Sequence, residues 1–319
     1  MKRHMICVLG GTGFVGRHLA NQLAAAGHRV RVPTRHRERH RDLLVLPTVE
    51  VVEANVHDPA ELAGVLAGCD TAINLVAVLN EARRDQFRHV HVELPRKLGA
   101  AMREKNVGRL LHMSALNADA RQGASRYLRS KGEGEDLAHS LAGTGIQVTS
   151  FRPSVIFGPD DHFFNKFAAL LKLPGPLPLP CPDARFAPVF VGDVARAFVT
   201  ALGNKTTFGQ RYDLCGPRAY TMRQLVQYAA EVLGVKKTLI GLPDAVSRLQ
   251  AAVMGHLPGK PFTRDNYDSM QVAAVCDGPF PAVFGFTPTA VEAVVPYYLG
   301  RSNQHAIFNA VRQEARHEY

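Results

Sequence analysis

The sequence predicts an α/β protein built on a doubly wound parallel sheet, with a smaller C-terminal α/β lobe. In the first half of the chain, short apolar runs alternate with segments of helical periodicity, which is typical of successive β-α-β units. A glycine-rich turn stands between the first apolar run and the first helical segment. The 319 residues suffice for one large core with a smaller lobe packed beside it.

The elements of the first 157 residues follow a regular rhythm. The expected strands are Met5–Leu9, His28–Thr34, Thr48–Glu53, Asp70–Val76, Arg109–Ser114 and Ile146–Arg152. The expected helices are Phe14–Ala26, Pro59–Ala67, Glu93–Lys105 and Tyr127–Ala142. Gly27, Gly68 and Gly108 stand where helix C-caps are expected. We therefore assign residues 1–157 to one sheet domain.

The pattern changes after Phe157. Residues 173–188 are too rich in proline for a helix or a central strand, so we expect a loop there. A strand at Val189–Val191, a helix at Asp193–Leu202 with Asp193 as its N-cap, and a strand at Arg211–Cys215 follow. We expect residues 189–215 to return to the first domain.

The rest of the chain is assigned to a smaller, substrate-side lobe, residues 158–188 and 216–300, and to a polar tail, residues 301–319. Thr221 and Gln224 have the spacing of a capping box, which opens a helix that reaches Leu233. A second helix, Asp244–His256, has an apolar stripe along one face, formed by Val246, Leu249, Val253 and Leu257. We expect this stripe to be core, with contact to a partner or a membrane surface as the alternative.

Composition indicates which cellular compartment and which classes of ligand to expect. No apolar run reaches the length of a membrane span, and the N-terminus lacks the pattern of a signal peptide, so a cytoplasmic protein is expected. The five scattered cysteines form no CxxC pair and are expected to be reduced thiols. The net charge of +10 comes with no nucleic-acid-binding signature, so no nucleic acid is expected and an anionic small molecule or membrane surface is favoured. No metal site is expected.

The turn Gly10-Gly-Thr-Gly-Phe-Val-Gly16 predicts a Rossmann-type dinucleotide site. Gly10 permits the tight turn, Gly13 lets the backbone approach the pyrophosphate, and Gly16 lets the helix pack closely on the strand. The helix N-terminus offers free N–H groups to the phosphates.

The end of the second strand indicates which dinucleotide binds. An acidic residue here would bind the ribose 2′-OH of NAD, but Thr34 is followed by Arg35. Arg35, with Arg39 one turn later, matches a 2′-phosphate, so NADP(H) is favoured and NAD(H) stays open. Solvated surface arginines are the other interpretation.

Tyr127 and Lys131 lie at positions i and i+4 of an expected helix, on the same face. A phenol acting as a general acid or base near neutrality must have its pKa of about 10 lowered by about three units, which a neighbouring ammonium favours. Ser114, at the end of the fifth strand, could orient a substrate oxygen. These three residues are the candidate catalytic set.

These motifs, together with Arg152-Pro-Ser-Val-Ile-Phe-Gly158 and Val191-Gly-Asp-Val-Ala-Arg196, resemble the extended and atypical short-chain dehydrogenase/reductase superfamily of NAD-dependent epimerases and dehydratases. Residues 73–81 and 114–135 are more similar to bacterial relatives of the nucleotide-binding accessory subunit of respiratory complex I. This resemblance implies a dinucleotide cofactor and peripheral association with a membrane, such as the inner membrane, or with a respiratory complex, beside an unknown small-molecule substrate.

The resemblance also implies roles for individual residues. The glycine turn with Thr12, Phe14 and Val15 would hold the pyrophosphate, and Asn55 with Val56 would lie at the adenine. The remaining contacts along the cofactor would be Leu75, Val76, Ala77, Ser114, Lys131, Pro153 and Val155.

The chain departs from the active members of this family at three places. Asn55 replaces an aspartate, Val76-Ala-Val-Leu79 replaces an alanine–glycine run, and the segment between Ser114 and Tyr127 is short. Two functions are therefore expected: an NADP(H)-binding accessory or regulatory protein, or an active reductase, dehydrogenase or epimerase with Ser-Tyr-Lys chemistry.

Overall fold

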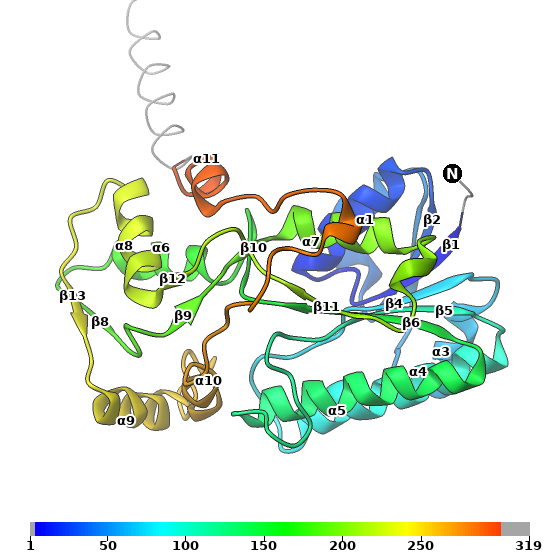
Figure 1. The fold of residues 1–319 in the computed structure, drawn as a ribbon, viewed down its shortest axis with the longest axis horizontal. Helices are drawn as coiled ribbons and strands as arrows, with labels where there is room; N and C mark the ends of the chain where they lie inside the picture. Colours follow the sequence, from blue (N-terminus) through cyan, green and yellow to red (C-terminus); the bar gives the residue numbers. More distant parts are fainter. Residues whose placement is uncertain (1–3, 301–319) are drawn as a thin grey trace, which may run out of the picture.

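A computed structural model describes residues 4–300 and contains a parallel sheet between two layers of helices, with a smaller lobe at one side (Figure 1). The seven strands of the sheet are all parallel, in the order β11-β6-β5-β4-β1-β2-β3. Their bounds are β1 Met5–Leu9, β2 Arg29–Thr34, β3 Val49–Glu53, β4 Thr71–Asn74, β5 Arg109–Met113, β6 Gln147–Pro153 and β11 Arg211–Leu214. The predicted fold class is confirmed.

Helices cover both faces of this sheet. On one face α1 (Phe14–Ala25) packs against α7 (Val191–Ala201), and on the other α3 (Pro59–Leu66), α4 (Leu94–Glu104) and α5 (Arg126–Ser140) lie side by side (Figure 1). A short helix, α2 (Arg41–Leu44), links β2 to β3. Each face has its own apolar core, with Leu19 and Phe198 in one and Leu62 and Leu98 in the other. The strand order reverses between β1 and β4, so ligands are expected at the carboxyl ends of these two strands.

The smaller lobe has a third core, which is built around Phe157, Phe164 and Leu225. Its helices are α6 (Phe164–Leu171), α8 (Met222–Val232), α9 (Asp244–Met254), α10 (Arg264–Ser269) and α11 (Val295–Leu299). Three two-stranded sheets pair β7 (Ile156–Phe157) with β10 (Val189–Phe190), β9 (Arg185–Phe186) with β12 (Tyr220–Thr221), and β8 (Leu177–Leu179) with β13 (Leu239–Gly241). The expected polar tail, residues 301–319, lies outside the described residues.

Local signals placed most element ends correctly. Gly27 and Gly68 adopt the left-handed conformation at φ 79° and 73°. The prediction for Gly108 was wrong, because Asn106 takes the left-handed position there at φ 58°, which asparagine tolerates better than most residues. The capping box of Thr221 and Gln224 at α8 is confirmed.

Two predictions about the middle of the chain were wrong. Residues 173–188 contain β8 and β9, because a pair of strands leaves free edges at which proline is tolerated. Asp193 is not an N-cap, since α7 begins at Val191. Its carboxylate instead accepts hydrogen bonds from the N–H (2.6 Å) and hydroxyl (3.2 Å) of Thr289, so it ties the chain after β13 to the first domain.

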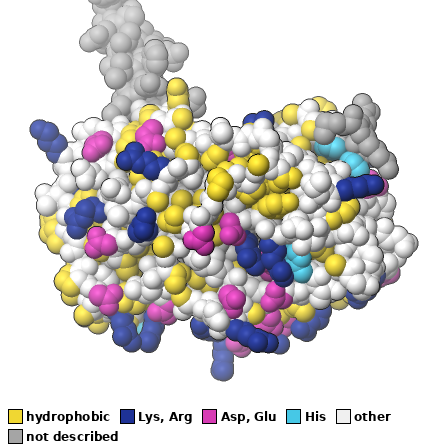
Figure 2. Space-filling view, viewed as in Figure 1, with side chains coloured by type: hydrophobic (Ala, Val, Ile, Leu, Met, Phe, Trp, Pro, Cys, Tyr) yellow, Lys and Arg dark blue, Asp and Glu magenta, His cyan; other side chains and the backbone are white. Residues whose placement is uncertain are grey.

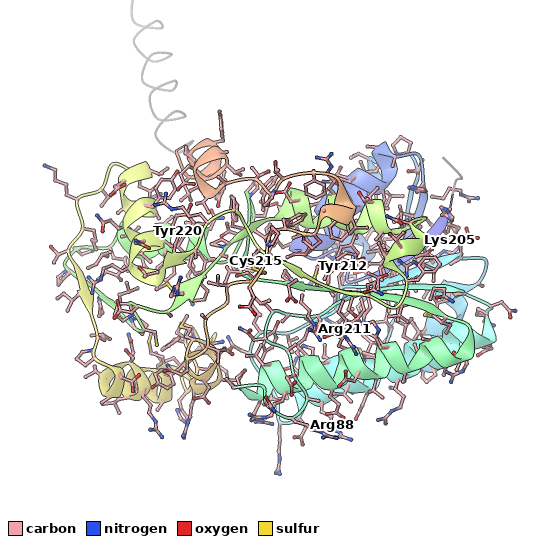
Figure 3. All side chains as sticks on the ribbon, in the orientation of Figure 1. Arg88, Lys205, Arg211, Tyr212, Cys215 and Tyr220 are labelled. Atoms are coloured by element: carbon pink, nitrogen blue, oxygen red, sulfur yellow. A yellow bond between two sulfur atoms is a disulfide. The ribbon has the colours of Figure 1, made fainter. Side chains whose placement is uncertain are left out.

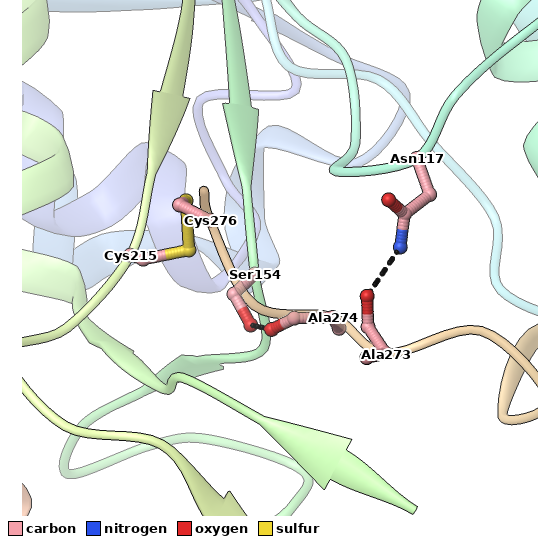
Figure 4. The surroundings of a disulfide bond; sticks show 6 residues. All are labelled: Asn117, Ser154, Cys215, Ala273, Ala274 and Cys276. Atoms are coloured by element: carbon pink, nitrogen blue, oxygen red, sulfur yellow. Dashed lines mark hydrogen bonds between the residues drawn. A yellow bond between two sulfur atoms is a disulfide. The ribbon is translucent and has the colours of Figure 1, made fainter. Parts of the chain in front are cut away.

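The expectation that all cysteines are reduced thiols was also wrong. Cys215, just after β11, and Cys276 form a disulfide (Figure 4). These cysteines are 61 residues apart, and only the folded chain brings them together. The segment before Cys276 is held further by Ser154, which donates to the Ala274 carbonyl at 2.6 Å, and by Asn117, which donates to the Ala273 carbonyl at 2.9 Å. Cys7, Cys69 and Cys181 are free.

The apolar stripe of α9 is not core. Val246, Leu249, Val253 and Leu257 are 44%, 64%, 58% and 47% exposed. The buried side of the helix consists of Ser247 and Ala251 instead. None of the helices within residues 4–300 is long and apolar enough to cross a membrane.

Candidate functional site

The glycine turn has the backbone conformation that the sequence predicted. Gly10 adopts φ 77°, and a Cβ there would also lie 3.1 Å from the backbone of Leu75 and Val76. A Cβ at Gly16 would lie 2.4 Å from the Gly10 carbonyl oxygen, which is a steric clash. Gly11, which the sequence analysis did not single out, is equally constrained, since its Cβ would lie 2.8 Å from Val32.

The N-terminus of α1 suits a phosphate. Gly13 is the N-cap residue, no side chain caps the helix, and its first turn contains no acidic residue. In contrast, Asp58, Ser125 and Thr221 cap α3, α5 and α8 with side-chain oxygens. An uncapped helix N-terminus leaves N–H groups at Phe14 and Val15 that can bind an anion. The residues present therefore fit a dinucleotide pyrophosphate, with half-buried Thr12 and Phe14 beside exposed Gly13.

Cationic groups gather at the ends of β2 and β3. Arg35 and Arg39 are exposed, and among residues 4–300 neither has a carboxylate within 4.0 Å. The pKa of His57 is lowered to about 4, chiefly by burial and then by the positive charges of His89, Lys97 and Arg35. Arg35 is therefore close to the segment that also carries Asn55 and Val56, where the adenine was predicted. Thr34 is buried, and its hydroxyl accepts a 3.4 Å hydrogen bond from the His36 N–H.

The loop after the carboxyl end of β4 contains the next residues that were predicted to contact the cofactor. The strand ends at Asn74, so Leu75 and Val76 lie in the loop after it. The prediction that the strand extends to Val76 was wrong. Ala77 is exposed beside them. The loop is fixed by buried His91, whose Nε2 accepts a 3.1 Å hydrogen bond from the Val78 N–H and whose Nδ1 lies 2.8 Å from Ser130 Oγ.

The end of β6 contributes the backbone beside this loop. The Pro153 carbonyl accepts a 3.0 Å hydrogen bond from the Leu116 N–H, and the Val155 carbonyl accepts one of 2.9 Å from Val189. Pro153 is buried and Val155 is half-buried. Both residues therefore lie between the sheet and the smaller lobe.

Ser114 contacts a buried carboxylate. Its hydroxyl donates a 2.8 Å hydrogen bond to the carboxylate of Glu135, which is 1% exposed. The same carboxylate accepts hydrogen bonds from Arg152 Nε at 2.9 Å and forms an ion pair with Arg211 Nε at 3.2 Å. Figure 3 shows Arg211 between β11 and α5. Ser114 therefore belongs to a buried polar cluster that joins α5 to the sheet.

Tyr127 lies in an environment that keeps its phenol neutral. Its ring contacts Phe87 and His91 edge-on, at centroid distances of 5.9 and 5.5 Å. Burial and the negative charge of Asp265 raise the pKa of Tyr127 to about 12. The Asp265 carboxylate accepts hydrogen bonds from the N–H groups of Arg126 (2.7 Å) and Tyr127 (3.2 Å), so it caps α5 from the smaller lobe. The pKa thus moves away from the lowered value that general acid–base chemistry would need.

Lys131 is 2% exposed, and its ammonium donates to the Met113 carbonyl at 2.5 Å. Burial lowers the pKa of Lys131 to about 8, opposed by the charge of Glu135. The three candidate catalytic residues therefore lie near one another at the ends of β5 and α5. No hydrogen bond joins any two of them within the described part of the chain.

Sequence reasoning missed Glu135 and Asp265. Glu135 is one helical turn beyond Lys131, and that spacing was the available signal for it. Asp265 is 139 positions from the backbone group that it caps, and no local pattern indicates such a contact.

Comparisons with known proteins agree with this geometry. Residues 6–215 match the NAD dependent epimerase/dehydratase family. The chain is 30% identical over 299 residues to NADH dehydrogenase (ubiquinone) 1 alpha subcomplex subunit 9, mitochondrial, of Mus musculus, covering 89% of this chain and 77% of that protein. It is also 30% identical over 250 residues to a ceramide reductase of Caulobacter vibrioides, covering 76% of this chain and 74% of that protein.

Solved structures show the same fold. The crystal structure of gox2253 superimposes with a TM-score of 0.76 at 21% identity, covering 95% of this chain and 99% of that one. The UDP-glucose 4-epimerase of Thermotoga maritima gives 0.75 at 16% identity, with the same coverages of 95% and 99%. The chain belongs to the NAD dependent epimerase/dehydratase family, an extended short-chain dehydrogenase/reductase family, and is homologous to the complex I subunit.

Gly13→Val should abolish dinucleotide binding while the protein stays folded. Gly13 has φ −76°, which any residue adopts, and the nearest atom to its Cβ is the Gly10 carbonyl oxygen at 3.3 Å. The new side chain would occupy the place of the pyrophosphate. Calorimetric titration with NADPH would measure the loss, and an unchanged dissociation constant would remove the glycine turn from the site. Gly16→Val is the contrasting variant, because its clash should prevent normal folding.

Lys131→Met should stabilise the ligand-free protein at pH 7, by about 1–3 kcal/mol. A pKa lowered to about 8 means that the folded state holds the ammonium less well than the unfolded chain does. The penalty is complete below pH 8 and fades toward pH 10.5, so the gain should shrink with rising pH. Urea unfolding at pH 7 and pH 10 measures this, with the half-buried Lys97→Met as control. A gain that is independent of pH would contradict the assignment.

Proposed function

We propose that this protein is an NADP(H)-binding accessory or regulatory protein in which the dinucleotide mainly stabilises the fold. The observation that carries the proposal is the 2.8 Å hydrogen bond from the Ser114 hydroxyl to the Glu135 carboxylate. In addition, the pKa of Tyr127 is raised to about 12. A serine held by a buried carboxylate and a neutral phenol do not form a proton relay. The 30% identity to a complex I subunit supports this role, with peripheral association with a membrane or a respiratory complex.

The proposed cofactor role has a structural basis. The residues predicted to contact the dinucleotide come from the ends of β1 to β6, from the start of α1 and from α5. A ligand that bridges these elements stabilises the native state by about 2.7 kcal/mol when present at 100 times its dissociation constant. When bound, the nicotinamide group would supply hydride chemistry, but this proposal does not require turnover.

NADP(H) is proposed over NAD(H) because of the charges at the end of β2. Arg35 follows that strand where an acidic residue would bind the ribose 2′-OH. Arg35 and Lys97 both carry positive charge near His57, and their positive potential favours a 2′-phosphate.

Arg35→Asp should reverse this preference. The dissociation constant for NADP⁺ should rise by about 10–100-fold, because a charge-assisted hydrogen bond contributes roughly 1.5–3 kcal/mol. NAD⁺ binding should be unchanged or tighter. Titration calorimetry with both dinucleotides measures the ratio, and Arg103→Asp, on exposed surface in α4, controls for net charge. An unaltered ratio in Arg35→Asp would refute the assignment of the 2′-phosphate pocket.

A second candidate function is an NADP(H)-dependent reductase. Within residues 4–300 the Tyr127 hydroxyl makes no hydrogen bond, so it is free to donate a proton to a substrate carbonyl oxygen. Lys131, one turn along the same helix, would favour the phenolate that remains. The 30% identity to a ceramide reductase supports this alternative.

Tyr127→Phe separates the two candidates. For an accessory protein, NADPH should raise the melting temperature of the wild type and of Tyr127→Phe equally. Absorbance at the NADPH band should also persist when aliphatic and aromatic ketones and long-chain 3-ketolipids are added. Ketone-dependent oxidation of NADPH by the wild type that disappears in Tyr127→Phe would overturn the accessory role and establish the reductase.

A further inference from the structure

The outer face of α9 is an exposed apolar surface on a helix at the edge of the smaller lobe (Figure 1). Its large side chains are Val246, Leu249 and Val253, and Leu257 follows just beyond the end of the helix; all four are between 44% and 64% exposed. Ala245 and Ala252 are exposed between them. The helix therefore has the opposite arrangement to an ordinary surface helix: a serine lies on its buried face, and its leucine and valine side chains face solvent. Such an arrangement costs solubility unless another apolar phase covers it.

We infer that this surface, the α9 face, docks the protein on an anionic lipid bilayer. The inference deepens the proposed function, in which peripheral membrane association is one part, and it specifies the surface that makes the contact. An amphipathic helix that lies in the interface buries its apolar side chains at the boundary of the headgroups and acyl chains.

The charges around the α9 face complement anionic headgroups. Arg248 and Arg264 are exposed, and neither has a carboxylate within ion-pair distance among the described residues. Two acidic groups of this region accept hydrogen bonds, although Asp244 is exposed. Asp244 accepts a 2.6 Å hydrogen bond from the Tyr267 hydroxyl, and Asp265 caps α5.

The surrounding surface carries charges of both signs. Asp268 is half-buried in α10, next to these groups. In Figure 2, Lys and Arg side chains stand among Asp and Glu side chains along the lower edge of the molecule, the edge at which Figure 1 places α9, α10 and α5. An anionic bilayer would attract Arg248 and Arg264 at the rim of the α9 face while the apolar side chains insert.

The size and shape of the α9 face favour a lipid surface over a second copy of the chain. A helix of 11 residues is about 16 Å long and about 10 Å wide. That area is well below the roughly 800 Å² that each partner buries in a standard protein interface. The helix also forms a projecting edge with α10 as its main neighbour, and a projecting edge suits insertion into a fluid phase.

The α9 face is connected to the predicted cofactor site. Lys260 follows it and donates its ammonium proton to the Glu81 carbonyl, while its own carbonyl accepts a 3.3 Å hydrogen bond from Asn80 Nδ2. Leu79, 60% exposed, precedes Asn80 and follows the loop of Leu75–Ala77. Docking through α9 would therefore bring the loop after β4 near the lipid surface.

The test is co-sedimentation with vesicles. The full chain, loaded with NADPH, is mixed with vesicles of phosphatidylcholine alone or of phosphatidylcholine with phosphatidylglycerol. Binding is expected to the second kind and to weaken with added salt, because exposed charges are screened. The double variant Leu249→Ser/Val253→Ser should bind at least tenfold more weakly, since it removes the inserting side chains.

The matched control is Leu173→Ser/Val45→Ser, the same two changes at residues that are 58% and 77% exposed elsewhere. It should bind vesicles as the wild type does. The variant Arg248→Gln/Arg264→Gln should lose the preference for phosphatidylglycerol. Circular dichroism and NADPH titration on every variant keep folding and cofactor binding separate from docking.

Three results would overturn the inference. These are no sedimentation of the wild type with anionic vesicles, equal binding by Leu249→Ser/Val253→Ser and its control, or a wild-type dimer that becomes monomeric in Leu249→Ser/Val253→Ser without vesicle binding. The last result would identify the α9 face as a protein interface. Failure of vesicle binding with intact NADPH binding rejects the docking surface alone, whereas absence of NADPH binding rejects the proposed function.

Discussion

The buried carboxylate of Glu135 is the constraint on which the site depends. It joins α5 to three parts of the sheet, through Ser114 after β5, Arg152 in β6 and Arg211 in β11. A carboxylate that is 1% exposed is stable only with such partners, so these contacts fix where α5 lies. The same carboxylate also accepts the hydrogen bond of the Ser114 hydroxyl, one of the three candidate catalytic residues.

A second constraint comes from phosphate binding. The glycine turn leaves α1 without a side-chain cap, although α3, α5 and α8 are capped. Lys131 is likewise held in a buried place that lowers its pKa to about 8. Both features cost stability in the free protein, and a bound anionic dinucleotide would offset the first of them.

The smaller lobe is tied closely to the sheet domain. Asp265 caps α5, the Cys215–Cys276 disulfide holds the segment that crosses Ser154, and Asp193 binds Thr289. Of these contacts, the one made by Asp265 lies next to Tyr127, since its carboxylate also accepts a hydrogen bond from the Tyr127 N–H. The α9 face stands on this lobe, which connects the proposed docking surface to the cofactor site through Lys260 and Asn80.

The sequence alone determined the fold class, the glycine turn, the capping box at α8 and the seven strands of the main sheet, because each depends on residues close in the chain. The roles of Arg35, Tyr127 and Lys131 remain predictions. Only the tertiary structure decided the rest. It paired Cys215 with Cys276, placed Asp265 on α5, engaged Ser114 with Glu135 and left the α9 stripe exposed. Periodicity shows that a helix has an apolar face, but burial depends on which distant segment packs there, and that information is not local.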